Sequence, residues 1–355
     1  MRCQLLIVQL LIVWDYFVFL SIGVHQALFG FGSRFEKNGR SVNNIIRMKK
    51  NRRSLLKAIG LGSIAAIGPS ATFAQSKAAG RFSYCLNTST IRGQRPGLKK
   101  YIEIAAKAGY DGIEVWIEDV KKYLAEGNEA ADLKTMVADH GLRVENAIGF
   151  APWMVADEQE SQAGFMQMKE EMEILAAIGC HRVAAPGVGA KAPVDLMLAG
   201  KRYKALLALG RETGVMPQLE FWGAFAPFHH LGQVLMVAAV ADDPDTRLLP
   251  DVYHLFRGGS GFEGLKLISG KAIEIFHMND FPGDIPREQQ QDKDRIYPGD
   301  GVAPLGQIIR DLKAMGGDKI LSLELFNPGY WEQDPLEVAK TGLEKMKSAV
   351  DSALA

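Results

Sequence analysis

The amino-acid sequence predicts a single-domain α/β fold, a closed (β/α)8 TIM barrel. Short β-prone runs alternate with amphipathic helical stretches between residues 81 and 353, and no long low-complexity linker interrupts them. Eight such repeats in about 275 residues match the size of this barrel. An open doubly wound sheet is the rival, but no Gly-x-Gly-x-x-Gly motif follows the first predicted strand.

The elements follow one another in a regular order. Eight strands are predicted from short runs rich in apolar, β-branched and aromatic residues: Phe82–Thr88, Gly112–Trp116, Arg143–Ile148, Arg182–Ala185, Met216–Phe221, Arg247–Leu249, Ala272–Met278 and Ile320–Leu325. Helical stretches separate or follow them, among them Gly97–Ala108, Phe165–Ile178, Pro193–Thr213, Val302–Met315 and Pro335–Ala353. Glycines 109, 141, 179 and 214 each end a helical stretch, where a residue without Cβ suits the left-handed cap.

Composition and charge limit the classes of protein to consider. Of the 355 residues 47% are hydrophobic and 23% charged, which excludes a mainly disordered chain. Lys+Arg and Asp+Glu both number 41, so no excess of positive charge indicates nucleic acid as a partner. Residues 1–74 hold 10 basic and 2 acidic residues, which leaves 31 and 39 in residues 75–355, a net charge of −8 there. The positive charge therefore lies in a leader ahead of an acidic domain.

Residues 48–74 have the three-part order of an export signal. Arg52-Arg53 lie in a basic start, a moderately apolar stretch follows, and Thr72 and Ala74 fit the −3 and −1 positions of a cleavage site. This order resembles a twin-arginine signal peptide. We therefore expect the twin-arginine export machinery as a partner and a periplasmic location. A basic amphipathic helix on a globular domain is the alternative.

Residues 1–47 precede this signal. The stretch 5–31 is strongly apolar but contains Asp15, so a membrane anchor is one interpretation. A second hydrophobic segment ahead of a complete export signal makes little physical sense. We therefore favour a start at Met48, with residues 1–47 a mis-assigned extension, an interpretation that N-terminal sequencing of the exported protein would test.

Four predicted strand ends bear side chains that bind metal ions: Glu220, Asp251, His277 and Glu324. The carboxyl ends of barrel strands converge on one face, so these side chains are expected to meet. A carboxylate in an apolar strand, such as Glu324 between two leucines, is costly to bury unless it is paired or bound to a cation. Taken singly, each residue also fits a buried salt bridge or a core histidine. Together they favour one divalent ion, Mn²⁺ or Mg²⁺, with Co²⁺ or Zn²⁺ as alternatives.

With these residues the chain resembles the sugar phosphate isomerase/epimerase family, the xylose-isomerase-like barrels, over about residues 81–353. The shared motif is Glu at the end of strand five, Asp-x-x-His after strand six, His-x-x-Asp at strand seven and Glu at strand eight. The resemblance implies that the four residues named above are the metal ligands. It further implies that His254 hydrogen-bonds substrate oxygens and that Glu220 and Glu324 are the catalytic acid/base pair.

This chemistry is reasonable for a keto-sugar or a related polyol. Removing a proton from the carbon next to a carbonyl creates an enediolate, whose charge a divalent cation stabilises. Two carboxylates on opposite faces can then remove and return the proton, which gives isomerisation or epimerisation. A lyase or dehydratase would use the same site if the enediolate expelled a β-leaving group. A non-catalytic sugar-binding barrel is another alternative, whereas a DNA-repair endonuclease fits the acidic domain poorly.

One position departs from the ketose 3-epimerases of this family, which place an arginine six residues after the strand-seven histidine. Gly283 stands there, and Arg287 or Arg295 could substitute as a substrate-binding residue from the long segment Phe281–Gly301. This segment is long for a βα loop and could cover the substrate. A solvated charged loop without a catalytic part is the alternative.

Aromatic residues indicate a carbohydrate substrate. Four tryptophans fall at or just after predicted strand ends: Trp116, Trp153, Trp222 and Trp331. Their rings would pack on the C–H faces of a sugar, and we expect Trp116 and Trp222 to bind the substrate, with ordinary packing under loops as the alternative. Glu114 and Asn146 are further candidates to line the pocket. No Gly-rich phosphate cradle or Lys/Arg cluster stands at the strand ends, which favours an unphosphorylated sugar, keto-sugar or glycoside.

Assembly and redox state are less constrained. A homo-oligomer is compatible with the sequence, which specifies no interface. Cys85 and Cys180 would allow one disulfide in the periplasm, but nothing in the sequence shows that they meet.

Overall fold

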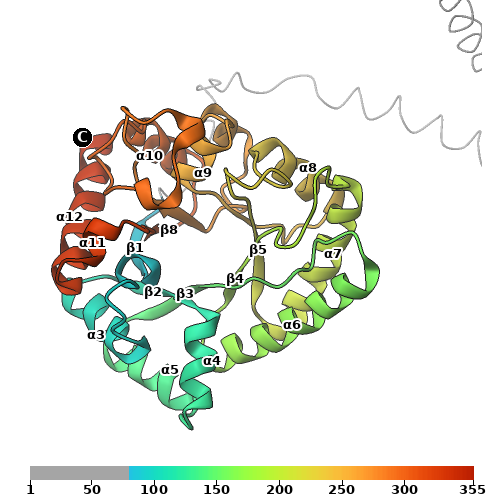
Figure 1. Cartoon of the computed structure of the whole chain (residues 1–355), viewed down its shortest axis with the longest axis horizontal. Coiled ribbons are helices and arrows are strands. Elements are labelled where there is room, and N and C mark those ends of the chain that lie inside the picture. The colour runs from blue at the N-terminus through green and yellow to red at the C-terminus, as the bar shows by residue number, and fades with distance from the viewer. Residues whose placement is uncertain (1–79) are drawn as a thin grey trace, which may run out of the picture. The chain divides into compact units, whose positions relative to one another are not determined.

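The computed structural model describes residues 80–355. The signal expected at residues 48–74 and the segment 1–47 lie outside the described residues. No helix in the described part of the chain is long and apolar enough to cross a membrane. The described residues belong to one compact unit, in which the helices surround the strands (Figure 1).

Eight parallel strands form the wall of the barrel: β1 Phe82–Asn87, β2 Gly112–Trp116, β3 Arg143–Ile148, β4 Arg182–Ala185, β5 Met216–Glu220, β6 Leu248–Leu249, β7 Ile275–Met278 and β8 Lys319–Leu323. Five of them pair in the order β3-β2-β1-β8-β7, and the other three pair in the order β4-β5-β6. Single bridges, one of them between Asp251 and His277, join the β6 and β7 segments, and β3 lies beside β4. This arrangement confirms the predicted (β/α)8 TIM barrel.

The α-helices of the described residues alternate with these strands (Figure 1): α3 Leu98–Ala108, α4 Ile117–Ala125, α5 Ala130–Asp139, α6 Glu158–Ala177, α7 Leu196–Thr213, α8 Leu231–Ala241, α9 Val252–Arg257, α10 Leu305–Ala314, α11 Pro328–Trp331 and α12 Pro335–Leu354. Short 3-10 helices cover Thr88–Ile91, Glu263–Leu267, Arg287–Gln289 and Asp292–Asp294. The predicted helical stretches are confirmed, and all except the last begin at a different residue from the one predicted. Helix α6 begins well before Phe165 because the Asp157 side chain accepts a hydrogen bond from the Glu160 N–H and caps it.

Most strand ends agree with the prediction, and the differences have local causes. Strand β7 begins at Ile275 rather than Ala272, because the Ala272 N–H donates to the Ser269 carbonyl in a turn. Strand β8 ends at Leu323, but the Glu324 N–H still donates to the Met278 carbonyl at 3.1 Å. Glu324 is therefore held beside β7 although it lies outside the ladder.

The predicted glycine turns are confirmed. Gly109, Gly141, Gly179 and Gly214 all have positive φ, from 72° to 92°, and each follows a helix. An L-residue with a Cβ is strained in this region, so glycine lets each helix turn sharply into the next strand.

The barrel interior holds both apolar and polar side chains. One apolar cluster includes Cys85, Leu249, Ile275 and Ile320, and Trp116 packs against it. Buried polar side chains, among them Glu114 and His277, share this interior. Cys85 and Cys180 are both buried and free, so they form no disulfide in this structure.

Ion pairs close the amino end of the barrel. Glu274, just before β7, contacts Arg182 of β4 at 2.7 Å and Arg247, just before β6, at 2.6 Å. Glu145 of β3 joins the same network through Arg182. The metal-binding candidates lie at the opposite end of these strands.

Candidate metal and substrate site

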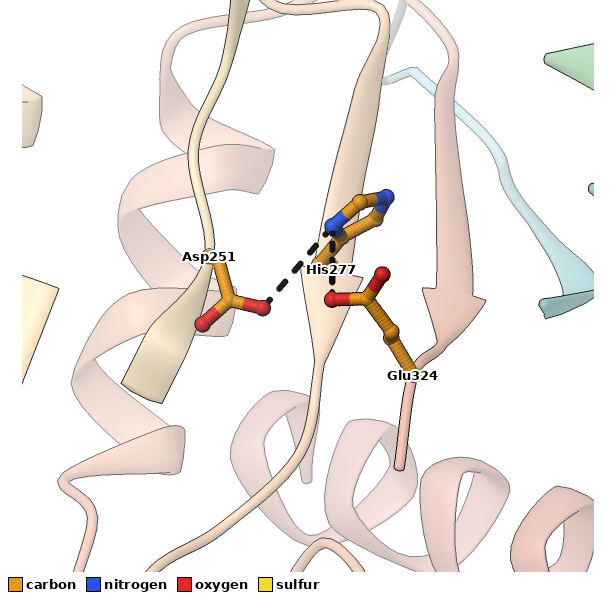
Figure 2. Close-up of side chains that lie close together, drawn as sticks. All are labelled: Asp251, His277 and Glu324. Atoms are coloured by element: carbon orange, nitrogen blue, oxygen red, sulfur yellow. Dashed lines mark ion pairs between the residues drawn. The ribbon is translucent and has the colours of Figure 1, made fainter. Parts of the chain in front are cut away.

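Three of the four predicted metal ligands meet at the carboxyl end of the barrel. Asp251, His277 and Glu324 each offer a ligand atom, and these atoms lie within 4.8 Å of one another (Figure 2). His277 Nδ1 is 3.2 Å from Glu324 Oε2 and 3.8 Å from Asp251 Oδ2. All three side chains are buried, and the Arg295 guanidinium pairs with both carboxylates.

Hydrogen bonds from neighbouring residues orient the Asp251 and Glu324 side chains. Asp251 is the N-cap of α9, and its Oδ1 accepts the His254 N–H at 2.7 Å, which leaves Oδ2 facing the cluster. Asn279 Nδ2 donates to that Oδ2 at 2.9 Å. Glu324 Oε1 accepts from Asn87 Nδ2 at 3.1 Å, and its Oε2 faces His277. Each carboxylate therefore keeps one oxygen directed at the cluster.

Several buried atoms at this place have no hydrogen-bond partner among the described residues. They include His277 Nδ1, Glu220 Oε2 and Arg295 Nε. An orphaned imidazole nitrogen beside two carboxylates is the donor set that a divalent cation prefers, so the residues present fit a metal ion.

Glu220 stands somewhat apart from the other three candidate ligands. It ends β5, is buried, and is outside the group whose ligand atoms lie within 4.8 Å, but it lines the same cavity as Glu324. Burial raises the pKa of the Glu220 carboxyl; the His277 ring opposes this effect, and the Glu324 and Glu114 carboxylates add to it. Glu220 is thus suited to carry a proton.

Glu114 lies beneath His277 rather than on the wall of the cavity. It is fully buried on β2, its Oε1 is 2.9 Å from His277 Nε2, and it is not among the residues that line the cavity. Asn146 of β3, the other interior candidate, donates its Nδ2 to the same oxygen at 2.7 Å. The structure therefore places both residues behind the candidate metal ligands.

Arg295 is the arginine that the structure brings to the site. It is buried, and its Nη1 lies 3.0 Å from Asp251 Oδ2 and 2.7 Å from Glu324 Oε2. Its Nη2 contacts Asp292 Oδ1 at 2.7 Å. Arg287 instead pairs with the neighbouring Glu288, is largely exposed and does not line the cavity.

His254 lines the cavity next to Arg295. Its Nδ1 accepts the Gly223 N–H at 3.1 Å, which puts the hydrogen of the neutral ring on Nε2. Arg295 Nη2 lies 3.0 Å from that Nε2. Burial, together with the Arg295 charge, lowers the pKa of His254 to about 4, so the ring is neutral at pH 7.

Aromatic rings form much of the remaining cavity wall. The cavity has a volume of about 360 Å³, and its lining includes Trp116, Phe150, Trp222, Phe225 and Phe326. Neighbouring rings touch: the centroids of Trp116 and Phe150 are 5.2 Å apart, and those of Trp222 and Phe225 are 5.9 Å apart. These rings give one side of the cavity an apolar surface opposite the carboxylates.

Two of the four tryptophans do not reach this cavity. Trp153 is fully buried, and Trp331 of α11 donates its Nε1–H to the Ser89 carbonyl at 3.1 Å. Three phenylalanines and Asp292 also line the cavity and were not predicted from the sequence. Phe326 had a usable signal, because it follows Glu324 by two residues on the same strand end.

Comparison with known proteins identifies several relatives. The sequence model of the family described as "Xylose isomerase-like TIM barrel" matches residues 102–349. The chain is 28% identical to an inosose isomerase of Bacillus velezensis over 273 residues, which cover 75% of this chain and 96% of that protein. It is 23% identical over 261 residues to a 3-dehydroshikimate dehydratase of Pseudomonas putida, covering 70% of this chain and 39% of that one. A solved structure of the IolI protein with a bound zinc atom matches with a TM-score of 0.71 at 25% identity, covering 76% of this chain and 99% of that one.

Proposed function

Because the chain belongs to the xylose isomerase-like TIM barrel family, we propose that it is a divalent-metal-dependent isomerase or epimerase acting on a keto-sugar or a related polyol. One observation carries this proposal: the cluster of Asp251, His277 and Glu324 lies at the cavity that Glu220 and Glu324 line. The similarity to inosose isomerases supports a cyclic hydroxyketone as the class of substrate.

Four side chains would hold the metal ion: Glu220, Asp251, His277 and Glu324. Three carboxylates and one imidazole suit Mn²⁺ or Mg²⁺, and Co²⁺ and Zn²⁺ are the alternatives. The zinc atom in the similar IolI structure supports a divalent ion as the cofactor. When bound, such an ion would stabilise the negative charge of an enediolate.

Glu220 and Glu324 are the proposed acid/base pair. Both line the cavity; Glu220 ends β5 and Glu324 directly follows β8, and these two strands belong to different parts of the barrel wall. Glu220 Oε2 is free of hydrogen bonds from the described residues, so it can take or give a proton without first breaking a contact. Asn87 and Arg295 hold both oxygens of Glu324, which fixes its position against the substrate.

His254 and Arg295 would orient the substrate oxygens. The His254 Nε2–H faces Arg295 Nη2, and a guanidinium has only hydrogens to offer. Two donors that face each other need a shared acceptor, and a carbonyl or enediolate oxygen of the substrate supplies one. Because His254 is neutral at pH 7, it donates this hydrogen bond without transferring a full proton.

The aromatic wall and the charge of the cavity support an unphosphorylated substrate. Trp116 and Trp222 present apolar surface on which the C–H face of a sugar ring can pack. Among the described residues that line the cavity, Arg295 is the single residue with a permanent positive charge, and two carboxylates already occupy its Nη1. A phosphate group would lack a cationic partner there.

A lyase or dehydratase is the second candidate, and the similarity to 3-dehydroshikimate dehydratases favours it. Both outcomes begin with removal of the same proton, so the same residues serve both. The products separate them, because an isomerase gives a product of unchanged formula whereas a dehydratase gives one that lacks water.

The test of the proposed function is metal analysis followed by a substrate panel. The purified protein, loaded with Mn²⁺, Mg²⁺, Co²⁺ or Zn²⁺ in turn, is incubated with keto-sugars, inososes and sugar phosphates, and the products are identified by NMR. We expect isomerised products from at least one unphosphorylated keto-sugar or inosose. Turnover of sugar phosphates alone would contradict the substrate assignment, and sugar binding without any turnover would favour a binding protein.

Export by the twin-arginine route is a separate proposal, supported by the order of residues in 48–74. Substituting Arg52-Arg53 by two lysines should leave the precursor in the cytoplasm, and cell fractionation measures this. A mature chain that begins at Gln75 would support cleavage after Ala74. A mature chain that retains residues before Met48 would contradict the interpretation of 1–47 as an extension.

A further inference from the structure

Glu114 is a buried carboxylate for which the proposed reaction has no use. It lies on β2, fully shielded from solvent, and it does not line the cavity. A buried negative charge without a function is costly, so the contacts of Glu114 should show what it does.

Four hydrogen-bond donors from four different strands converge on this carboxylate. Oε1 accepts from Asn146 Nδ2 at 2.7 Å and lies 2.9 Å from His277 Nε2. Oε2 accepts from Asn87 Nδ2 at 3.0 Å and from Ser322 Oγ at 2.5 Å. These contacts leave the Glu114 carboxylate little freedom to rotate, and they supply polar partners for both of its oxygens.

The contact with His277 decides which ring nitrogen bears the hydrogen. An ionised carboxylate only accepts hydrogen bonds, so His277 Nε2 must be the donor. In the neutral ring Nδ1 then has a free lone pair, and Nδ1 is the atom that faces Asp251 and Glu324. Nδ1 is also buried and makes no hydrogen bond with the described residues.

We infer that Glu114 is a positioning residue that sets the tautomer and the orientation of His277 for metal binding. Histidine ligands in proteins usually donate their second ring N–H to a carboxylate or carbonyl, which orients the ring and raises its basicity as a ligand. This role differs from the pocket-lining role expected from the sequence. It rests on the metal site of the proposed function.

Asn87 connects Glu114 to Glu324, a second proposed metal ligand. The same Nδ2 that donates to Glu114 at 3.0 Å also donates to Glu324 Oε1 at 3.1 Å. A shift of Glu114 would therefore disturb the supports of both His277 and Glu324.

The experiment compares metal affinity in Glu114→Gln and in the wild-type protein. Each protein is loaded with Zn²⁺ and, separately, with Mn²⁺, and the ion is withdrawn by titration with a chromophoric chelator. The glutamine side chain has the same shape as glutamate and keeps an acceptor for His277. It removes the negative charge of the carboxylate and turns an N–H towards Asn87 Nδ2. We expect binding weaker by about 10–100-fold, the usual effect of losing such a partner.

Glu145→Gln is the matched control. Glu145 is also a buried carboxylate on a strand, next in sequence to Asn146, but it pairs with Arg143 and Arg182 at the amino end of the barrel. We expect this variant to lose stability and to keep the wild-type metal affinity. A purely structural role of Glu114 would make the two variants alike.

The outcomes separate this inference from the proposed function. If the wild-type protein binds neither Zn²⁺ nor Mn²⁺, the metal site of the proposed function is wrong. If the wild type binds an ion and Glu114→Gln binds it equally well, the positioning role alone is wrong. Should Glu114→Gln fail to fold, Ser322→Ala removes one of the four contacts, and we expect it to weaken metal binding several-fold. Unchanged affinity in Ser322→Ala would then overturn the inference.

Discussion

Replacing Glu274 by glutamine should destabilise the barrel without changing the candidate metal and substrate site. The Glu274 carboxylate accepts from Arg247 Nε at 2.6 Å and from Arg182 Nε at 2.7 Å. Hydrogen bonds to charged groups contribute roughly 1.5–3 kcal/mol each. A glutamine keeps one acceptor and turns an N–H towards the other arginine.

The expected loss is smaller than the sum of two such bonds. About a third of the Glu274 side chain is exposed, 32%, so solvent screens the charges. We therefore expect unfolding to be easier by about 2 kcal/mol, which corresponds to a fall in Tm of roughly 4–8 °C for a domain of this size.

The pH dependence of this effect has a definite sign. Partial burial raises the pKa of Glu274, but the Arg247 and Arg182 contacts outweigh it and lower the pKa overall. The stabilisation is then complete above the ordinary carboxyl pKa of about 4.3 and is lost as the pH falls through the lowered folded value. The gap between wild type and variant should therefore close below pH 4.

Urea unfolding at pH 7 and at decreasing pH measures this prediction. Glu337→Gln is the control, because Glu337 is mostly exposed and, within residues 80–355, pairs only with Lys340, so its loss should change stability by less than about 0.5 kcal/mol. The reasoning is refuted if Glu274→Gln is as stable as the control variant at pH 7, or if the gap widens on acidification.

The other predictions concern the site. Glu220→Gln should abolish turnover, measured by NMR of the products, while the far-UV circular dichroism and Tm stay close to wild type. Arg295→Lys should lower kcat/KM by about tenfold or more, because a single ammonium cannot replace the planar contacts to Asp251, Glu324 and Asp292; Arg287→Lys, outside the cavity, should leave kcat/KM unchanged. Trp222→Ala should raise KM for the sugar more than it lowers kcat, since it removes stacking surface rather than a reacting group. Treatment with a chelator should abolish activity and lower the Tm, and added Mn²⁺ or another divalent ion should restore both.

The sequence was sufficient to predict the barrel and its metal-binding candidates, for a definite reason. Strand and helix periods are visible over short windows, and the strand ends of a parallel barrel converge without further information. Asp251, His277 and Glu324 could therefore be grouped although they are far apart along the chain.

The depth of a side chain inside the barrel could not be predicted in this way. Glu114 and Trp116 project to the same side of β2, because side chains alternate along a strand. Trp116 takes the place at the cavity, so Glu114 lies one level below it and contacts His277. Which side chain of a strand reaches the cavity depends on how that strand is shifted relative to its neighbours. The sequence of one strand does not contain this register.

Which of Arg287 and Arg295 reaches the site also depends on how the segment Phe281–Gly301 folds. Arg287 and Arg295 are equivalent in the sequence, because both follow strand seven in one long segment. In the structure Arg295 Nη2 donates to Asp292 Oδ1 at 2.7 Å, and Asn327 Nδ2 donates to the Arg295 carbonyl at 3.1 Å. These two contacts hold Arg295 at the site. The Asn327 contact joins residues 32 positions apart, which no local pattern relates.

Exchange of substrate hydrogen with solvent tests the central claim most directly. The metal-loaded wild-type protein and Glu220→Gln are each incubated with a keto-sugar or an inosose in D₂O, and ¹H NMR follows the proton on the carbon next to the carbonyl. We expect deuterium to enter this position with the wild-type protein and not with Glu220→Gln. Equal exchange in both proteins, or none with a wild-type protein that holds its metal and binds the sugar, would contradict it.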